Sequence, residues 1–325
     1  MINSVQVAFD WVNRHSRRHL PLLASTMTNA SNAPYVIVPE FSLLETLPAH
    51  QRKRFETALQ LMHETLADQL SWEQIAQKSA ISASHFHRQF TELFNETPGQ
   101  YLSRFRLQYA VSLLMSDNGT NITEIAHASG YSSSQAMAKA LKRELGLTAK
   151  AIRKMSTSAT PRETNELLNK LAHPAGDNSL ENQLVQDLPC ELIWYPERGM
   201  KKVEYADFDW DVIFDTLGEN CTHLISATPI AELEKQWKDI SYTIGDWQAS
   251  TEEYDHYLAE GYYLCCTAYL VSDIAYGETI EKLFEYAKEQ GHSVDLSGCL
   301  IEMVLDVELD IMGGVTFIFQ IPIKS

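Results

Sequence analysis

The sequence predicts a multidomain protein in which an all-α domain with two helix-turn-helix units is followed by an α+β domain. Three observations lead to this fold class. A chain of 325 residues is too long for one compact core of ordinary size. One helix-turn-helix pattern occurs twice between Ser71 and Ile152. After residue 189, aromatic and β-branched runs bounded by turn residues indicate strands.

Residues 1–50 are expected to form an accessory N-terminal segment. Its first part has apolar residues at loose helical spacing, and Ser25–Asn32 is polar and typical of a loop. The run Tyr35–Val38 before Pro39 is compatible with a short strand. The helical spacing involves Val5, Phe9 and Val12.

Residues 51–155 are predicted to be helical throughout and to contain the repeated pattern. In each copy an Ile-Ala pair precedes a short break, and a second helix with a buried apolar stripe follows. The copies are offset by 50 residues before the break and by 51 after it, so the second turn is one residue longer. The stripes are Phe86, Phe90 and Phe94 in the first copy, and Met137, Leu141 and Leu145 in the second.

Two further helices complete this domain. Phe55, Leu59, Met62 and Leu66 recur at three and four residues, which predicts an amphipathic helix before the first copy. A long helix is expected between the copies, from Pro98-Gly99 to a stop at Asp117-Asn118-Gly119. Thr120 or Asn121 is then expected to cap the following helix, with Glu124 placed for a capping box.

Residues 156–188 are predicted to be a linker, in which Glu163–Leu171 has the composition of a short helix. Residues 189–325 are predicted to form the α+β domain, a repeated strand–helix–strand–strand pattern with helices on one side of a sheet. Helices are expected over Trp210–Leu217 and Tyr276–Gln290. Strands are expected over Glu191–Tyr195, His223–Ala227, Tyr263–Leu270, Cys299–Asp306 and Val315–Ile323.

The net charge of −17 is divided unequally along the chain. Residues 1–155 carry 16 Lys and Arg against 12 Asp and Glu, a net charge of +4. Residues 156–325 carry 10 against 31, a net charge of −21. Because phosphate neutralisation occurs only where protein meets DNA, this division is compatible with a nucleic-acid-binding N-terminal half. An acidic C-terminal half is explained equally by solubility or by a cationic partner.

Other features of the sequence favour a reduced, cytoplasmic protein that has no contact with a membrane. No run approaches the roughly 18 apolar residues of a membrane-spanning helix, and the N-terminus lacks a signal-peptide pattern. The five cysteines are odd in number and lack paired metal-ligand spacing, so neither a disulfide framework nor a metal site is expected.

The second helix of each copy has a polar face opposite its buried stripe. Arginine can bind guanine bidentately, glutamine suits adenine, and serine, histidine and lysine can bind base edges or phosphates. A polar helix face is also what simple solvation produces, but two matched units with a positive net charge favour DNA reading. The candidate DNA-binding residues are Ser84, His87, Arg88, Ser134, Gln135 and Lys139.

The stretch SWEQIAQKSAISASHFHRQFTELFNETPGQYLSRFRLQYA, followed by NITEIAHASGYSSSQAMAKALKRELGLTAKAIRK, resembles the AraC/XylS family of bacterial transcription regulators over about 100 residues. The resemblance implies two subdomains bridged by a long helix, with both reading helices entering adjacent major grooves of double-stranded DNA. By position it also assigns base contacts to the six residues above. Four departures are Ala80 where the turn usually has Gly, Ala136-Met137 where an aromatic is usual, Ala149 for the familiar Pro, and Lys139 for the usual Arg. Because lysine lacks the rigid fork of arginine, the second helix is expected to discriminate bases less sharply.

From Pro189 onward the chain is similar to GyrI-like effector-binding domains, which consist of two βαββ units with a cleft between them. The similarity is carried by the element order and by the stretches GYYLCCTAYL, IEMVLD and VTFIFQIPI, and the two-domain order resembles Rob-type regulators. The resemblance implies a small, often cationic aromatic effector bound against a buried carboxylate, with Glu302 as the candidate by position. Aromatic residues expected to contact this effector are Tyr195, Trp210, Tyr263 and Tyr269.

The sequence therefore predicts a transcription regulator that binds DNA and an effector, has RNA polymerase as a further candidate partner, and needs no cofactor. Two alternatives for the C-terminal domain remain open. One is a small-molecule hydrolase in which Glu302 and Tyr263 or Tyr269 supply general-base chemistry. The other is an acidic protein-docking module. No catalytic triad order, phosphate loop or metal cluster supports an enzyme.

Overall fold

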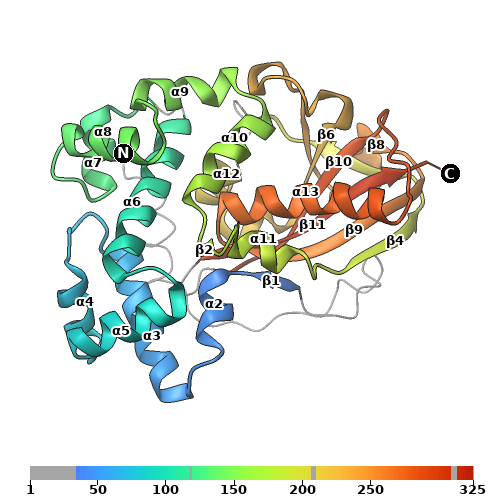
Figure 1. Ribbon diagram of the computed structural model, residues 1–325. Coiled ribbons are helices and arrows are strands. Elements are labelled where there is room, and N and C mark those ends of the chain that lie inside the picture. The colour runs from blue at the N-terminus through green and yellow to red at the C-terminus, as the bar shows by residue number, and fades with distance from the viewer. Residues whose placement is uncertain (1–33, 117–118, 206–209, 309–312, 325) are drawn as a thin grey trace.

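The computed structural model describes residues 34–116, 119–205, 210–308 and 313–324, and shows two halves side by side (Figure 1). The helical half comprises residues 49–158, and the sheet half comprises residues 35–37 together with residues 190–323. The chain passes between them twice, through residues 38–48 (the first crossing) and residues 159–189 (the second crossing). Val5, Phe9 and Val12, whose spacing in the sequence is loosely helical, lie outside the described residues.

The helical half consists of two small cores joined by the long helix α6. Phe86, Phe90 and Phe94 of α5 fill the first core, while Met137 and Leu141 of α8 fill the second, and all five are buried as predicted. The start of α6 packs in the first core and its later turns pack in the second. The helices are α3 (Ala49–Glu64), α4 (Trp72–Lys78), α5 (Ala83–Phe94), α6 (Pro98–Met115), α7 (Ile122–Ala128), α8 (Ser134–Glu144) and α9 (Ala149–Ser158).

The two helix-turn-helix units have the same turn geometry. The Ile81 amide donates to the Ala76 carbonyl at 2.9 Å, and the Tyr131 amide donates to the Ala126 carbonyl at 2.8 Å. The turns differ at the residue with positive φ, which is Ala80 (+56°) in the first unit and Gly130 (+74°) in the second. Alanine adopts this left-handed conformation only with strain, so the first turn stores strain that the second avoids.

Side-chain caps explain where several of these helices begin. Ser71 and Gln74 form a capping box at α4, and Thr97 and Gln100 form another at α6. Of the two candidates for the cap of α7, Asn121 is the N-cap, and its side chain accepts a hydrogen bond from the Glu124 amide at 2.9 Å.

The sheet half is built on a nine-stranded sheet with the order β1-β9-β11-β10-β6-β7-β5-β8, and β4 also pairs with β9. Pairing is antiparallel except between β1 and β9, so β1 and β4 share the outer edge of β9. The strands are β1 (Tyr35–Ile37), β4 (Cys190–Tyr195), β5 (Arg198–Lys202), β6 (Leu224–Pro229), β7 (Thr243–Asp246), β8 (His256–Leu258), β9 (Gly261–Leu270), β10 (Cys299–Glu308) and β11 (Gly314–Ile323).

Helices α12 (Trp210–Leu217) and α13 (Asp273–Glu289) cover one face of this sheet, with α11 beside them (Figure 1). The main core of the sheet half lies under these helices, and a second apolar cluster lies on the opposite face. Short 3-10 helices connect the strands at Gly218–His223, Ile230–Glu232, Trp237–Asp239 and Thr251–Glu253.

Both crossings are folded and packed, which differs from the expectation of a linker over residues 156–188. Leu167, Leu168 and Leu171 lie in the second core of the helical half, where burial of their side chains stabilises the segment. Within the segment 1–50, for which only an accessory role is expected, the short strand near Tyr35 is β1, which pairs with β9 at the edge of the sheet. The crossings contain α2 (Pro39–Leu44), α10 (Pro161–Leu168), a 3-10 turn (Asn169–Leu171), β2 (Pro174–Ala175), β3 (Asn178–Ser179) and α11 (Leu180–Val185).

The five strands expected after residue 189 are present, with His223 lying instead in a 3-10 helix. Strands β5, β7 and β8 are not predicted from the sequence because they are only three to five residues long, and β5 and β7 also contain charged residues and glycine. Within the described ranges, no helix is both long enough and apolar enough to cross a lipid bilayer.

Candidate nucleic-acid interface and buried carboxylate site

Helix α5 carries the first set of predicted DNA-binding residues. Ser84 and Arg88 are exposed, and the Arg88 Nη2 atom lies 3.5 Å from Nδ1 of His85. His87 is half-buried, and its ring centroid lies 5.3 Å from that of Trp72. The face opposite the phenylalanine stripe is therefore polar and open at Ser84 and Arg88, whereas His87 is partly engaged by α4.

Helix α8 carries the second set. Gln135 and Lys139 are exposed, and Ser134 is half-buried with its hydroxyl 3.5 Å from Oε1 of Gln135. The N-cap Ser133 accepts a hydrogen bond from the Ala136 amide at 3.2 Å, which fixes the start of the helix. Lys142, on the same helix, donates to the Gly146 carbonyl at 2.8 Å and so caps the helix end.

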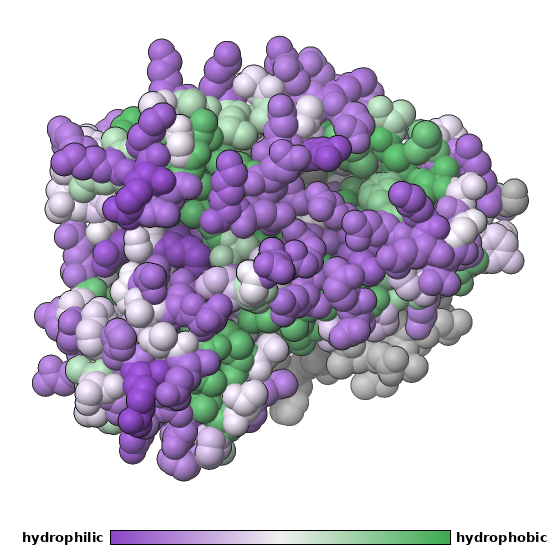
Figure 2. Space-filling model, viewed as in Figure 1, coloured by the Kyte–Doolittle hydropathy of each residue, from purple (hydrophilic) through white to green (hydrophobic). Residues whose placement is uncertain are grey.

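Helices α5 and α8 belong to units that lie at opposite ends of α6 (Figure 1). With 18 residues, α6 is about 27 Å long, which approaches the roughly 34 Å of one DNA helical turn. Hydrophilic side chains cover most of the helical half on the face shown in Figure 2, with hydrophobic areas among them. A cavity of about 80 Å³ between α3 and α5 adds basic groups from His50, Arg54 and His85, which the sequence pattern had not singled out.

Glu302, the predicted effector contact, is buried on the face of the sheet that the helices cover. Its side chain is 2% exposed, and its Oε2 accepts hydrogen bonds from Trp210 Nε1 at 2.7 Å and from the Tyr276 hydroxyl at 2.8 Å. Burial raises the pKa of the Glu302 carboxyl above its ordinary value, while the hydrogen bonds from Trp210 and Tyr276 oppose that rise. None of these partners is a cation.

Aromatic rings surround this carboxylate. The Phe317 ring centroid lies 5.7 Å from that of Trp210 and 6.0 Å from that of Tyr276. Tyr276 and Ser226 were missed from the sequence, although Ser226 is opposite Glu302 in the pairing of β6 and β10. Tyr276 lies on α13, and only the packing of that helix on the sheet brings its hydroxyl to the carboxylate.

The structure does not bring the other three predicted aromatic residues to Glu302. Tyr195 and Tyr263 lie on the opposite face of the sheet, where their ring centroids are 5.8 Å apart. The guanidinium group of Arg198 makes cation–π contacts with both rings, and its central carbon lies 3.9 Å from the centroid of the Tyr195 ring and 5.0 Å from that of the Tyr263 ring. Tyr269 is six residues further along β9, roughly 20 Å away, and stacks on Phe41 at 6.5 Å.

Comparison with known proteins concerns the helical half. Residues 75–155 match a family model described as a helix-turn-helix domain. The HTH-type transcriptional activators RhaS of Escherichia coli O139:H28 (strain E24377A / ETEC) and of Escherichia coli (strain SE11) are each 29% identical over 118 residues, which are 36% of this chain and 42% of those proteins. The chain thus spans about two fifths of the length of the curated relatives that it matches.

Two solved structures are similar to parts of the chain. A transcriptional regulator with an AraC-type DNA-binding domain from Chromobacterium violaceum is 24% identical, with a TM-score of 0.31, over 34% of this chain and 96% of that one. The DNA-binding domain of AdpA, solved with a target DNA, is 27% identical, with a TM-score of 0.29, over 31% of this chain and 90% of that one. The family model identifies a helix-turn-helix domain in residues 75–155, and the curated relatives show that this region is similar to HTH-type transcriptional activators named RhaS.

Proposed function

We propose that this chain is a one-component transcription regulator whose helical half reads double-stranded DNA and whose sheet half binds a small cationic aromatic effector. The observation that carries the proposal is the pair of matched helix-turn-helix units on the single helix α6. Such a pair can read two successive major-groove segments without a second protein copy.

In this proposal the exposed residues of α5 and α8 contact DNA. Arg88 binds guanine bidentately, Gln135 binds adenine, and Lys139 binds guanine or phosphate, while Ser84 and Ser134 bind base edges or the backbone. The structure reduces the role of His87, because its ring packs against Trp72. The basic side chains around the cavity between α3 and α5 are placed to contact flanking phosphates.

The order of elements in the sheet half supports the proposal of a GyrI-like domain. The units β5–α12–β6–β7 and β9–α13–β10–β11 each have the sequence strand–helix–strand–strand. In the sheet they appear as β9-β11-β10 followed by β6-β7-β5, so each unit has its last strand in the middle and the two units are reversed copies. This arrangement is what a duplicated βαββ domain requires.

Glu302 is the proposed effector contact because it is a buried carboxylate surrounded by aromatic rings. Such a group is costly when ionised and unpaired, so a cation that reaches it gains a strong interaction. Trp210, Tyr276 and Phe317 offer ring faces for a flat cation. An effector regulates only if it binds the active arrangement more tightly than the inactive one.

The hydrolase alternative loses its expected geometry, since Tyr263 and Tyr269 lie on the face of the sheet opposite Glu302. The Tyr276 hydroxyl replaces them as a neighbour of the carboxylate. The docking alternative rests on the acidic charge of the sheet half. RNA polymerase is a proposed partner whether the sheet half binds an effector or serves as a docking module.

DNA selection with the full chain, followed by fluorescence anisotropy on the selected operator, tests the DNA-reading proposal. Loss of one bidentate contact, about 1–3 kcal/mol, predicts that Arg88→Ala weakens binding by roughly 5- to 150-fold. Lys238→Ala, an exposed change in the sheet half, serves as the control and should alter affinity less than about twofold. Equal affinities for the two variants would reject the role of Arg88.

Thermal unfolding with benzyltrimethylammonium as probe tests the effector proposal. The cation should raise the Tm of the wild-type protein by mass action and leave that of Glu302→Gln unchanged. Phenylacetate, of similar size but opposite charge, is the control and should have no effect. A shift that persists in Glu302→Gln would reject this assignment, and turnover of an electrophile abolished by the same change would favour the hydrolase.

A further inference from the structure

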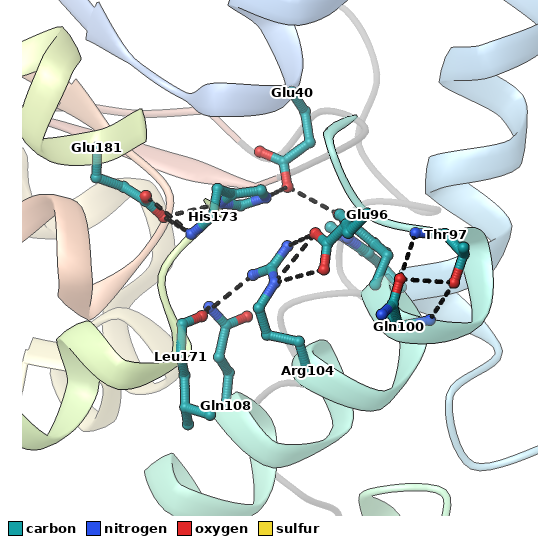
Figure 3. A network of polar contacts seen from close by, with 11 residues as sticks. Glu40, Glu96, Thr97, Gln100, Arg104, Gln108, Leu171, His173 and Glu181 are labelled. Carbon is teal, nitrogen blue, oxygen red and sulfur yellow. Dashed lines mark hydrogen bonds and ion pairs between the residues drawn. The ribbon is translucent and has the colours of Figure 1, made fainter. Parts of the chain in front are cut away.

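The two crossings meet at one buried point between the halves. Glu40 lies in the first crossing, on α2, and His173 and Glu181 lie in the second. The exposed fractions of these three side chains are all below 10%. The junction cluster, defined as Glu40, His173, Glu181 and Tyr101, therefore joins α2, the second crossing and α6. Figure 3 shows His173 between Glu40 and Glu181.

Histidine lies at the centre of the cluster. His173 Nε2 is 2.8 Å from Glu40 Oε1, and Nδ1 is 2.7 Å from Glu181 Oε1. The His173 amide also donates to Glu181, at 3.1 Å from Oε2, and the Tyr101 hydroxyl donates to Glu40 at 2.7 Å. With a carboxylate at each ring nitrogen, both nitrogens act as donors and the ring is the imidazolium form.

The surrounding charges agree with this state. Although burial and Arg104 oppose it, the two carboxylates raise the pKa of His173 to about 9. Despite burial, the nearby His173 holds the pKa of Glu40 well below its ordinary value. His63, whose ring nitrogen is 2.8 Å from the Tyr101 hydroxyl, is kept neutral because burial lowers its pKa to about 4.

One stripe of α6 contacts this junction. Tyr101, Arg104 and Gln108 lie three and four residues apart, so they share a helix face. Arg104 Nη1 and Gln108 Nε2 both donate to the Leu171 carbonyl, at 3.2 Å and 2.8 Å. Arg104 is held in turn by Glu96, at 2.6 Å from Nη2. Helix α6 is thus held by the first crossing at Tyr101 and by the second crossing at Arg104 and Gln108.

The same crossing is tied to the helix that contacts Glu302. Two residues beyond Tyr276 on α13, Glu278 accepts hydrogen bonds from Asn169 at 2.6 Å and from Asn182 at 2.7 Å. Ile274, two residues before Tyr276, packs in the second core of the helical half. The first turns of α13 therefore contact the buried carboxylate, the second crossing and the core beneath α8.

We propose that His173, held between Glu40 and Glu181, is a positioning residue that fixes α6 and thereby the spacing of the two reading helices on DNA. The inference rests on the proposed function. The first crossing packs in the first core through Leu44, and the second crossing packs in the second core through Leu171, so the contact between Glu40 and His173 braces the two units beside α6. Loss of this brace leaves each unit folded but lowers the fraction of molecules in which both units are spaced for simultaneous binding. A purely structural residue would affect binding to any DNA equally.

The test compares two DNA fragments, the selected operator with both half-sites and the same fragment with the second half-site scrambled. His173→Gln should bind the two-site operator at least fivefold more weakly than the wild-type protein, yet bind the single half-site within twofold of it. Arg162→Gln, which removes an exposed ion pair with Glu166 on the same crossing, is the matched control and should bind both fragments like the wild type. Hydrogen exchange should be faster in α6 of His173→Gln than in α6 of the control.

A second variant keeps the test informative if His173→Gln fails to fold, since that change leaves two buried carboxylates without their cation. The triple variant Glu40→Gln/His173→Gln/Glu181→Gln removes all charges together and should show the same loss confined to the two-site operator. Equal weakening on both fragments, or tighter two-site binding, would overturn the inference. A wild-type protein that binds neither fragment would instead overturn the proposed function.

Discussion

The strained turn of the first helix-turn-helix unit gives a prediction whose sign follows from one backbone angle. Ala80 has a φ of +56°, in the left-handed region, where an L-residue other than glycine carries roughly 1–2 kcal/mol of strain. Glycine removes that strain but loses about 0.5–1 kcal/mol through the greater freedom of the unfolded chain. From the middle of each range, Ala80→Gly should therefore stabilise the protein by about 0.7 kcal/mol.

The assay is urea unfolding of the full chain, followed by the helical circular dichroism signal. With a slope of about 2 kcal/mol per molar urea, the expected rise in the midpoint is roughly 0.3–0.5 M. Ala138→Gly, in the exposed middle of α8, is the control and should destabilise the helix by about 1 kcal/mol. A midpoint that stays unchanged or falls for Ala80→Gly would refute the strain argument.

In the turn of the second helix-turn-helix unit, replacing glycine by alanine should destabilise the protein. Gly130 has a φ of +74°, and an added Cβ would lie 2.3 Å from the Leu66 carbonyl oxygen. Both strain and a backbone clash oppose the alanine, so Gly130→Ala should cost more than about 2 kcal/mol. An effect no larger than that of Ala138→Gly would show that the turn can relax.

Three further predictions concern the junction, the buried carboxylate and α13. The pKa of His173 is raised from an ordinary 6.5 to about 9 in the folded protein, so the protonated ring stabilises the fold fully below pH 6.5, and this contribution is lost as pH rises through 9. The difference in Tm between the wild type and His173→Gln should therefore narrow from pH 7 to pH 10, and a constant difference would contradict an imidazolium at His173. Glu302→Gln removes the cost of burying a charge but keeps a hydrogen-bond acceptor, so the Tm of this variant at pH 7 should equal or exceed that of the wild type. A fall of several degrees would show that the hydrogen bonds to Glu302 already offset the cost of burying its carboxylate. An added Cβ at Gly277 on α13 would lie 2.0 Å from Oδ1 of Asn165 on α10, so Gly277→Ala should separate the two helices and speed hydrogen exchange in α10. Unchanged exchange would mean that the Asn165 side chain moves aside.

The helical half could be predicted in detail because its information is local. Residues three and four apart share a helix face, so the stripe of Phe86, Phe90 and Phe94 indicated both the helix and its buried side. Glu302 is a candidate through the resemblance to GyrI-like domains, and the alternation of a strand places it on the same face as Leu300 and Val304, which lie in the main core. Periodicity identifies which face is buried, and it does not by itself assign a role to Glu302.

The rest of the site depends on contacts that periodicity does not contain. Tyr195 and Tyr263 were grouped with Glu302 as aromatic residues on strands, but which of the two sheet faces they occupy is set by strand register and pairing. Glu40 and His173 are 133 residues apart and meet only because the chain passes twice between the halves. Residues 156–188 are predicted to be a linker because they begin with a polar stretch and contain Pro and Gly, but Leu167, Leu168 and Leu171 of this segment are buried in the second core.

The central claim, that two reading helices on one rigid α6 bind one face of DNA, is tested most directly by changing the spacing between the half-sites. Inserting about five base pairs turns the second half-site to the opposite side of the duplex, while about ten restores the side at a greater distance. Affinity of the wild-type chain should fall at least tenfold with the five-base-pair insertion and approach that of a single half-site. An affinity that does not depend on the insertion would contradict the claim.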